Sequence, residues 1–141
     1  LFRSVRLYDR VPRQTMDRIF ECADILALHL KDDPLFKYTI PSKLQHYLSI
    51  GKPIVAGIGG EAAEILHKSA AARVSSPCDV GALARNIVEV ARMDAAERAA
   101  MSMASVRYYN EHMNFEGTFL HTLALLQSHR KSGLATINQV A

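Results

Sequence analysis

The chain has 141 residues, of which 49% are apolar and 22% charged, and its net charge is +3. This length and balance predict one globular domain with a hydrophobic core and exclude a disordered or fibrous chain. The mild positive charge suits an anionic ligand or an anionic membrane surface, but it is too small to indicate a nucleic-acid partner. Since no apolar run reaches the ~18 residues of a membrane span, we expect a cytoplasmic protein, with the inner face of the cytoplasmic membrane as an alternative location.

The first forty residues predict a strand, a helix, a second strand and a loop. Ser4 to Tyr8 alternates as a strand does, and residues 13–23 place four apolar side chains on one helical face. The apolar run Ile25 to Leu28 is typical of a buried parallel strand, and the polar segment 29–40 predicts a loop. Because the sequence opens without Met, already in what resembles a strand, we expect it to be a fragment of a longer protein.

Strands and helices alternate through the rest of the chain. The expected elements are a helix at 42–50, a strand at 53–56, a Gly-rich loop at 57–60, a helix at 61–68, a strand at 72–74, a helix capped by Asp79, and helices at 94–110 and 115–131. This order predicts an α/β fold: a Rossmann-like parallel sheet with flanking helices and extra C-terminal helices. We therefore expect one domain over residues 1–131 and a C-terminal tail over residues 132–141.

Cysteine, aspartate and histidine residues give no metal signature. Cys22 and Cys78 are far apart, which predicts free thiols, and the pair Asp32 and Asp33 lacks a third ligand at suitable spacing. The histidines of the C-terminal helices are scattered and are expected to be structural or exposed; they are His112, His121 and His129.

Two segments stand where ligands bind in open α/β sheets, beyond the carboxyl ends of strands. In the first, Ser42 to Gln45 fits a helix-capping box, and the alternative is that Ser42, Lys43 and the first backbone N–H groups converge on a phosphate. In the second, Gly59 and Gly60 either form a simple turn or let a sugar or phosphate approach the backbone. Tyr38 and His46 bracket the helix start, so both could face one pocket.

Several of these patterns together resemble one family. The stretch ADILALHLKDDPLFKYTIPSKLQHYLSIGKPIVAGIGGEAAEIL is similar to the donor-binding part of GT-B glycosyltransferases of the retaining family four, in the subgroup that makes capsule, O-antigen or colanic-acid-type polysaccharides. The turn Pro41-Ser42-Lys43 matches that subgroup's phosphate-side phrase, and SPCDVGAL at 76–83 resembles the phrase that opens the next helix. The resemblance covers about residues 5–127.

The resemblance implies the C-terminal, donor-binding half of a GT-B enzyme. The parent would transfer a sugar from a nucleoside-diphosphate sugar to a glycan or lipid-linked acceptor, with no cofactor and no metal. It would bind the donor diphosphate through Pro41, Ser42, Lys43 and the backbone N–H of Leu44, with Tyr38, His46, Gly59 and Gly60 as weaker candidates for sugar and ribose contacts. It would have no nucleic-acid partner, and peripheral association with a membrane is compatible with it.

Two departures from the family pattern bear on activity. The family's paired glutamates should fall at Tyr38 and His46, and neither residue is acidic. The N-terminal acceptor-binding domain and an Arg–Lys pair that neutralises the diphosphate are not in the sequence, so the catalytic residues are unknown and the chain alone is expected to be inert. The alternatives are a non-catalytic, degenerate Rossmann-like module and a nucleotide-sugar epimerase-type GT-B domain.

Overall fold

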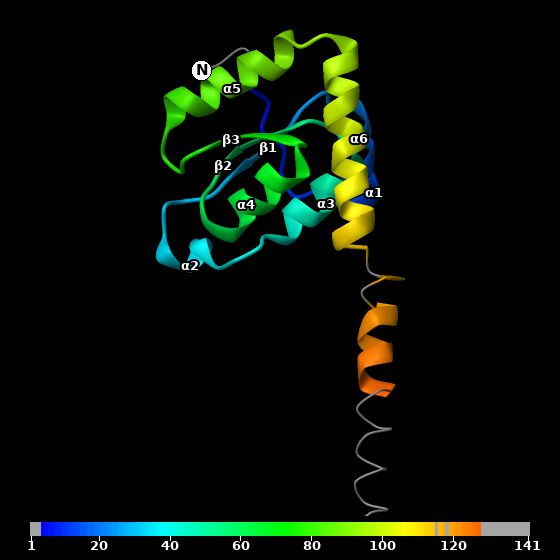
Figure 1. Cartoon of the computed structure of the whole chain (residues 1–141). Helices are drawn as coiled ribbons and strands as arrows, with labels where there is room; N and C mark the ends of the chain where they lie inside the picture. The colour runs from blue at the N-terminus through cyan, green and yellow to red at the C-terminus, as the bar shows by residue number, and fades with distance from the viewer. Residues whose placement is uncertain (1–3, 115, 118, 128–141) are drawn as a thin grey trace, which may run out of the picture.

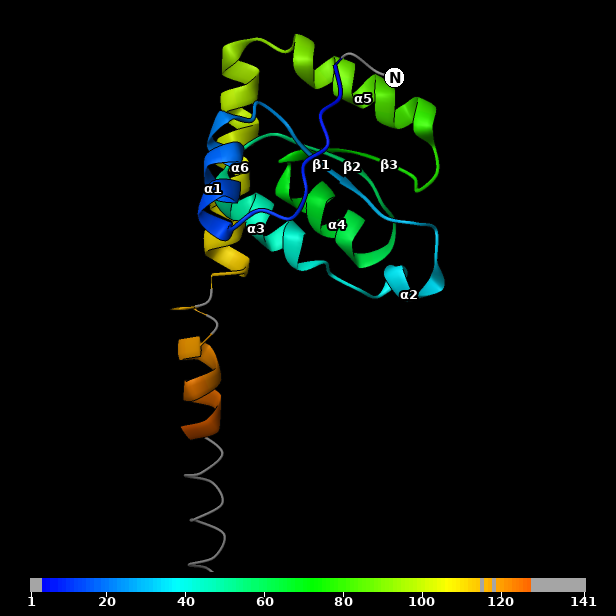
Figure 2. The same cartoon turned by 180° about the vertical axis from the view of Figure 1, so that it is seen from behind.

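A computed structural model describes residues 4–114, 116–117 and 119–127, and its centre is a parallel sheet between two layers of helices (Figures 1 and 2). The strands are β1 Leu26–His29, β2 Ile54–Gly57 and β3 Ala72–Ser75. They lie in the order β1-β2-β3, with Leu26 opposite Ile54 and Ile54 opposite Ala72. The expected α/β class is confirmed as a small, open, three-stranded parallel sheet with flanking helices.

The helices follow the strands in the alternation that the sequence predicts. They are α1 Arg13–Cys22, α2 Pro34–Lys37, α3 Ser42–Ile50, α4 Gly60–Ser69, α5 Val80–Arg92 and α6 Ala95–His112. Residues 116–117 and 119–127 are also helical and extend beyond the end of α6, away from the sheet (Figure 1). None of the helices in the described ranges combines the length and the apolarity that crossing a membrane requires. The expected tail and residues 128–131 lie outside the described residues.

The core lies on both faces of β2, whose residues Ile54, Val55 and Ala56 are all 0% exposed. Because side chains alternate along a strand, Ile54 and Ala56 face one way and Val55 the other. The first face packs against α3 and α4, and the second against α5 and α6, through buried residues that include Leu44, Leu48 and Leu66 on one side and Val90 and Met101 on the other. This two-sided burial explains why the strand reads as a continuous apolar run.

Helix α6 packs across α3. The Ser105 hydroxyl, which is 0% exposed, donates a hydrogen bond of 3.0 Å to the backbone oxygen of Leu48. Gly51 ends α3 in the left-handed region, at φ 73°, and a Cβ there would lie 2.5 Å from a methyl group of Val106. The first C-terminal helix is therefore an integral part of this domain.

Helix α1 joins the domain through aromatic contacts rather than through buried residues. The Phe20 ring lies edge-on to His46 and Tyr47 of α3, with centroid distances of 5.2 and 5.7 Å. The Tyr47 hydroxyl lies 3.5 Å from the Ala27 backbone oxygen, and burial raises the pKa of this hydroxyl above its ordinary value of 10.0.

The strand expected at residues 4–8 is wrong: Ser4 is in a turn and residues 5–8 have no regular secondary structure. Alternation alone does not make a strand, because a strand also needs a neighbour that accepts and donates its backbone hydrogen bonds. Here the apolar members of the pattern stay in solvent, Val5 at 56% and Leu7 at 94% exposure.

The segment 29–40, expected to be a loop throughout, contains the one-turn helix α2. The Asp33 carboxylate caps this helix by accepting a hydrogen bond of 2.9 Å from the Leu35 N–H. Pro34 occupies the first helical position, where the missing N–H costs nothing. The Asp-Pro dipeptide is therefore a helix start here rather than a turn.

The capping box expected at Ser42 to Gln45 does not form. The N-cap of α3 is Pro41, whose carbonyl oxygen accepts the Leu44 N–H at 2.9 Å, and no side chain caps the helix. Ser42 is already the first helical residue, so its hydroxyl is not positioned as an N-cap acceptor. By contrast, Asp79 and Asp94 cap α5 and α6, with hydrogen bonds of 2.8 Å to the N–H groups of Ala82 and Glu97.

Candidate functional site

The carboxyl ends of the three strands lie side by side at His29, Gly57 and Ser75. The loops that follow them enclose a hollow of about 150 Å³, which receives residues from all three loops: Lys31, Asp32, Asp33, Lys37, Gly59 and Pro77. Ligand pockets for whole small molecules are roughly 300–1,000 Å³, so this hollow has room for a phosphate or part of a sugar ring but not for a nucleotide sugar.

The start of α3 carries uncapped backbone donors. Among the described residues, the N–H groups of Ser42 and Lys43 have no acceptor, whereas the Leu44 N–H already donates to Pro41. The side chains of Ser42 and Lys43 are exposed, and the Leu44 side chain is 0% exposed in the core. Buried Leu44 thus fixes the helix while Ser42 and Lys43 remain available to an anion at its positive end.

The two segments singled out in the sequence are adjacent in space. Gly60 has φ 67°, and a Cβ on it would collide with the backbone of Lys37, its carbonyl oxygen included. Only glycine adopts this conformation readily and permits this approach, so the Gly59–Gly60 turn is packed directly against the end of α2. Since Lys37 immediately precedes Tyr38, the glycine turn adjoins the segment that leads into α3.

Tyr38 and His46 have different surroundings. Tyr38 is 79% exposed. His46 is half-buried with its ring against Phe20 of α1, so it contributes to packing between two helices. No hydrogen bond or ion pair links either side chain to another described residue.

The remaining polar candidates have local roles. His29 is exposed and its ring lies against Gly57, Asp33 caps α2, and Cys22 and Cys78 are free thiols at the surface. Within the described ranges, no group of three or more histidine, cysteine, aspartate and glutamate side chains is arranged to hold a metal ion.

Sequence reasoning missed Lys31, Lys37 and Pro77, which line the hollow beside Gly59. A signal was present for Lys31 and Pro77, because each follows closely after an expected strand, at the edge where parallel strands present their ligands. Lys37 had no such signal, because it lies further along the chain, at the end of α2. Lys31 and Lys37 make no ion pair with a described residue, so both ammonium groups are available to a ligand.

No protein-family model matches the chain, and no curated protein matches it.

Proposed function

We propose that this chain is the donor-binding domain of a GT-B retaining glycosyltransferase, which transfers a sugar from a nucleoside-diphosphate sugar to a glycan or lipid-linked acceptor. The observation that carries the proposal is the uncapped start of α3, where the N–H groups of Ser42 and Lys43 have no acceptor among the described residues and both side chains are exposed. This start occurs within the P-S-K phrase that resembles the phosphate turn of that family.

The chemical role of this turn is to stabilise the leaving nucleoside diphosphate. Cleavage of the sugar–phosphate bond places developing negative charge on the phosphate oxygen. Backbone N–H groups at a helix start, the helix dipole and an ammonium group stabilise such charge more than they stabilise the bound ground state. The hollow at the strand ends would add no net charge, because its two lysines are matched by two aspartates.

The acceptor site and the remaining catalytic groups would lie on a partner domain outside this sequence. The loops at the carboxyl edge of the sheet would face that domain, as ligands in α/β proteins lie at such edges and at domain interfaces. The chain alone would therefore bind donor but transfer no sugar.

Calorimetric titration with UDP, GDP and UMP tests the proposal. We expect a nucleoside diphosphate to bind, and Lys43→Ala to weaken that binding about tenfold or more, since a hydrogen bond to a charged group contributes roughly 1.5–3 kcal/mol. Lys68→Ala is the matched control, because Lys68 is equally a surface lysine but lies at the far end of α4, where it pairs with Glu64. If no nucleotide binds even at about millimolar concentration, or if both variants behave alike, the phosphate site at α3 is wrong.

One observation favours a second candidate, a non-catalytic Rossmann-like module. Tyr38 and His46 stand where the resembled family has glutamates, and His46 is engaged with Phe20 rather than free for a ribose. A module kept for assembly would retain the fold and lose nucleotide affinity. The UDP and GDP titrations separate the two candidates, because only the donor-binding domain should show saturable binding that depends on Lys43.

A further inference from the structure

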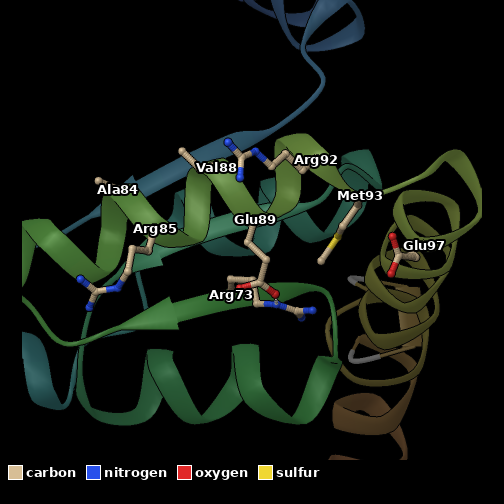
Figure 3. Close-up of a pocket in the computed structure, with 8 residues that line it drawn as sticks. All are labelled: Arg73, Ala84, Arg85, Val88, Glu89, Arg92, Met93 and Glu97. Atoms are coloured by element: carbon tan, nitrogen blue, oxygen red, sulfur yellow. Dashed lines mark hydrogen bonds and ion pairs between the residues drawn. The ribbon is translucent and has the colours of Figure 1, made fainter.

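A second hollow, of about 760 Å³, lies on the other side of the sheet from α3, along α5 and the outer side of β3 (Figure 3). Its walls include Arg73 of β3, Arg85, Val88, Glu89 and Arg92 of α5, and Glu97 of α6. It belongs to neither segment of the proposed donor site. We refer to it as the α5 groove.

The two carboxylates of the α5 groove are already engaged. Glu89 accepts a hydrogen bond of 2.6 Å from the Arg73 guanidinium (Figure 3). Glu97 accepts the Asp94 N–H at 2.9 Å in the capping box of α6. By contrast, neither Arg85 nor Arg92 has a hydrogen bond or an ion pair with any described residue. The groove therefore holds two guanidinium groups without an ion-pair partner among the described residues, and its three arginines and two glutamates give it a net charge of +1.

Arg85 and Arg92 lie on the same side of their helix. They are seven residues apart, which is about two turns or about 10 Å along the axis, and Val88 lies between them at 46% exposure. Since a strand rises about 3.3 Å per residue, acidic side chains two to four positions apart on one face of a strand would come within reach of both guanidinium groups.

The same groove borders an unpaired strand edge. The bonds from Ile54 N–H to Ala71 O and from Ile58 N–H to Ser75 O show that the odd-numbered residues of β3 pair with β2. The N–H and C=O groups of Ala72 and Val74 therefore point outward, and within the described residues no strand pairs with them. Figure 3 shows β3 along this open side, with α5 above it and α4 below.

From these observations we propose that the α5 groove binds an acidic peptide segment in extended conformation, which adds to β3 as a fourth strand and pairs its carboxylates with Arg85 and Arg92. Backbone hydrogen bonds to Ala72 and Val74 supply affinity in this mode of recognition, and the side-chain contacts supply specificity. An acidic partner is favoured over a second copy of this chain, because two copies of the groove would bring their unpaired arginines together at a cost.

Fluorescence anisotropy with a labelled peptide in which glutamate alternates with valine tests the proposal on the full chain. We expect saturable binding. The affinity should fall about tenfold or more in the double variant Arg85→Glu/Arg92→Glu, because the new carboxylates then face those of the peptide. The matched control is Arg13→Glu/Arg18→Glu, which changes the net charge equally on the exposed α1 and should leave binding within about twofold. Thermal unfolding checks that each variant is folded, and Arg85→Gln/Arg92→Gln replaces the reversal if it is not.

Two modified peptides complete the test. The glutamine version should bind about tenfold more weakly, since its charges are gone, and a version N-methylated at alternate residues should bind about tenfold more weakly, since it cannot pair along β3. Equal binding of the N-methylated peptide would overturn strand addition. Three results would overturn the acidic-peptide site. They are an equal loss of peptide affinity in the two charge-reversal variants, no binding at about millimolar peptide, and dimerisation in sedimentation that Arg85→Glu/Arg92→Glu abolishes.

Discussion

At Gly60 two constraints on a single residue coincide. Its φ of 67° lies in the left-handed region, and the space for a Cβ is occupied by the backbone of Lys37. A backbone neighbour cannot rotate away as a side chain can, so the contact allows no substitution without movement of α2. The turn between β2 and α4 and the segment before α3 are coupled through this one contact.

We therefore expect Gly60→Ala to lower the free energy of unfolding by about 3 kcal/mol, through the left-handed backbone and the collision together. Urea denaturation followed by circular dichroism measures this change in the free energy of unfolding. Gly117→Ala is the control, because a Cβ there meets nothing within 4 Å in a helical, exposed position. It should change stability by less than about 1 kcal/mol, in the stabilising direction. Similar values for the two variants would show that the approach of Lys37 to Gly60 does not exist in solution.

Tyr47 gives the molecule a pH-dependent stability at high pH. Burial raises the pKa of its hydroxyl in the folded chain above 10.0, the value expected for the unfolded chain. As the pH rises past 10.0, the unfolded chain loses this proton first, so the free energy of unfolding falls from there until the folded-state pKa is reached. Urea denaturation between about pH 8 and 11 should show a steeper fall for the wild type than for Tyr47→Phe. Parallel pH profiles would contradict the assignment to this residue.

At the scale of elements, the best predicted helix is the one with unambiguous ends. The expected bounds of α3, residues 42–50, are confirmed. Pro41 holds the chain extended before the helix, and Gly51 ends it with a left-handed residue. By contrast, the local pattern at residues 4–8 is typical of a strand, but whether a strand forms depends on a neighbouring edge that no local pattern contains.

The contact between α3 and α6 depends on a polar group that hydropathy does not reveal. The Leu48 carbonyl is in the last turn of α3, where backbone acceptors lack helical partners, and the buried Ser105 hydroxyl satisfies it. Ser105→Ala should cost about 1–2 kcal/mol of unfolding free energy, because a buried acceptor is left unpaired. Ser102→Ala, on the same helix and only half-buried, should cost less than about 0.5 kcal/mol. If chemical denaturation gives the two variants equal losses of unfolding free energy, the loss at Ser105 comes from lost volume and not from the unpaired Leu48 carbonyl.

At the scale of the whole molecule, the sequence predicts where the candidate site lies better than it predicts which residues line it. Strand ends and the glycine turn indicate the edge of the sheet at which the hollow lies, because parallel strands bring their carboxyl ends together. Lys31 could have been predicted, because it closely follows an expected strand, whereas Lys37 reaches the hollow only because α2 packs against Gly60. His46 was considered for a ribose, but its partner Phe20 lies on a helix 26 positions earlier, and no spacing rule connects the two.

The outward-facing backbone of β3 has a consequence for the rate at which its amide protons exchange with water. Because hydrogen bonding alternates along this edge strand, the amides of Arg73 and Ser75 should be protected, whereas those of Ala72 and Val74 should exchange at nearly the rate of a loop. Exchange followed residue by residue by NMR checks this, with the central strand β2 as the protected reference. Uniform protection along β3 in the free protein would mean that this edge is already covered. Three of the four residues of β3 are only partly buried. Neighbouring amides of this strand should therefore exchange at two different rates, one slow and one fast.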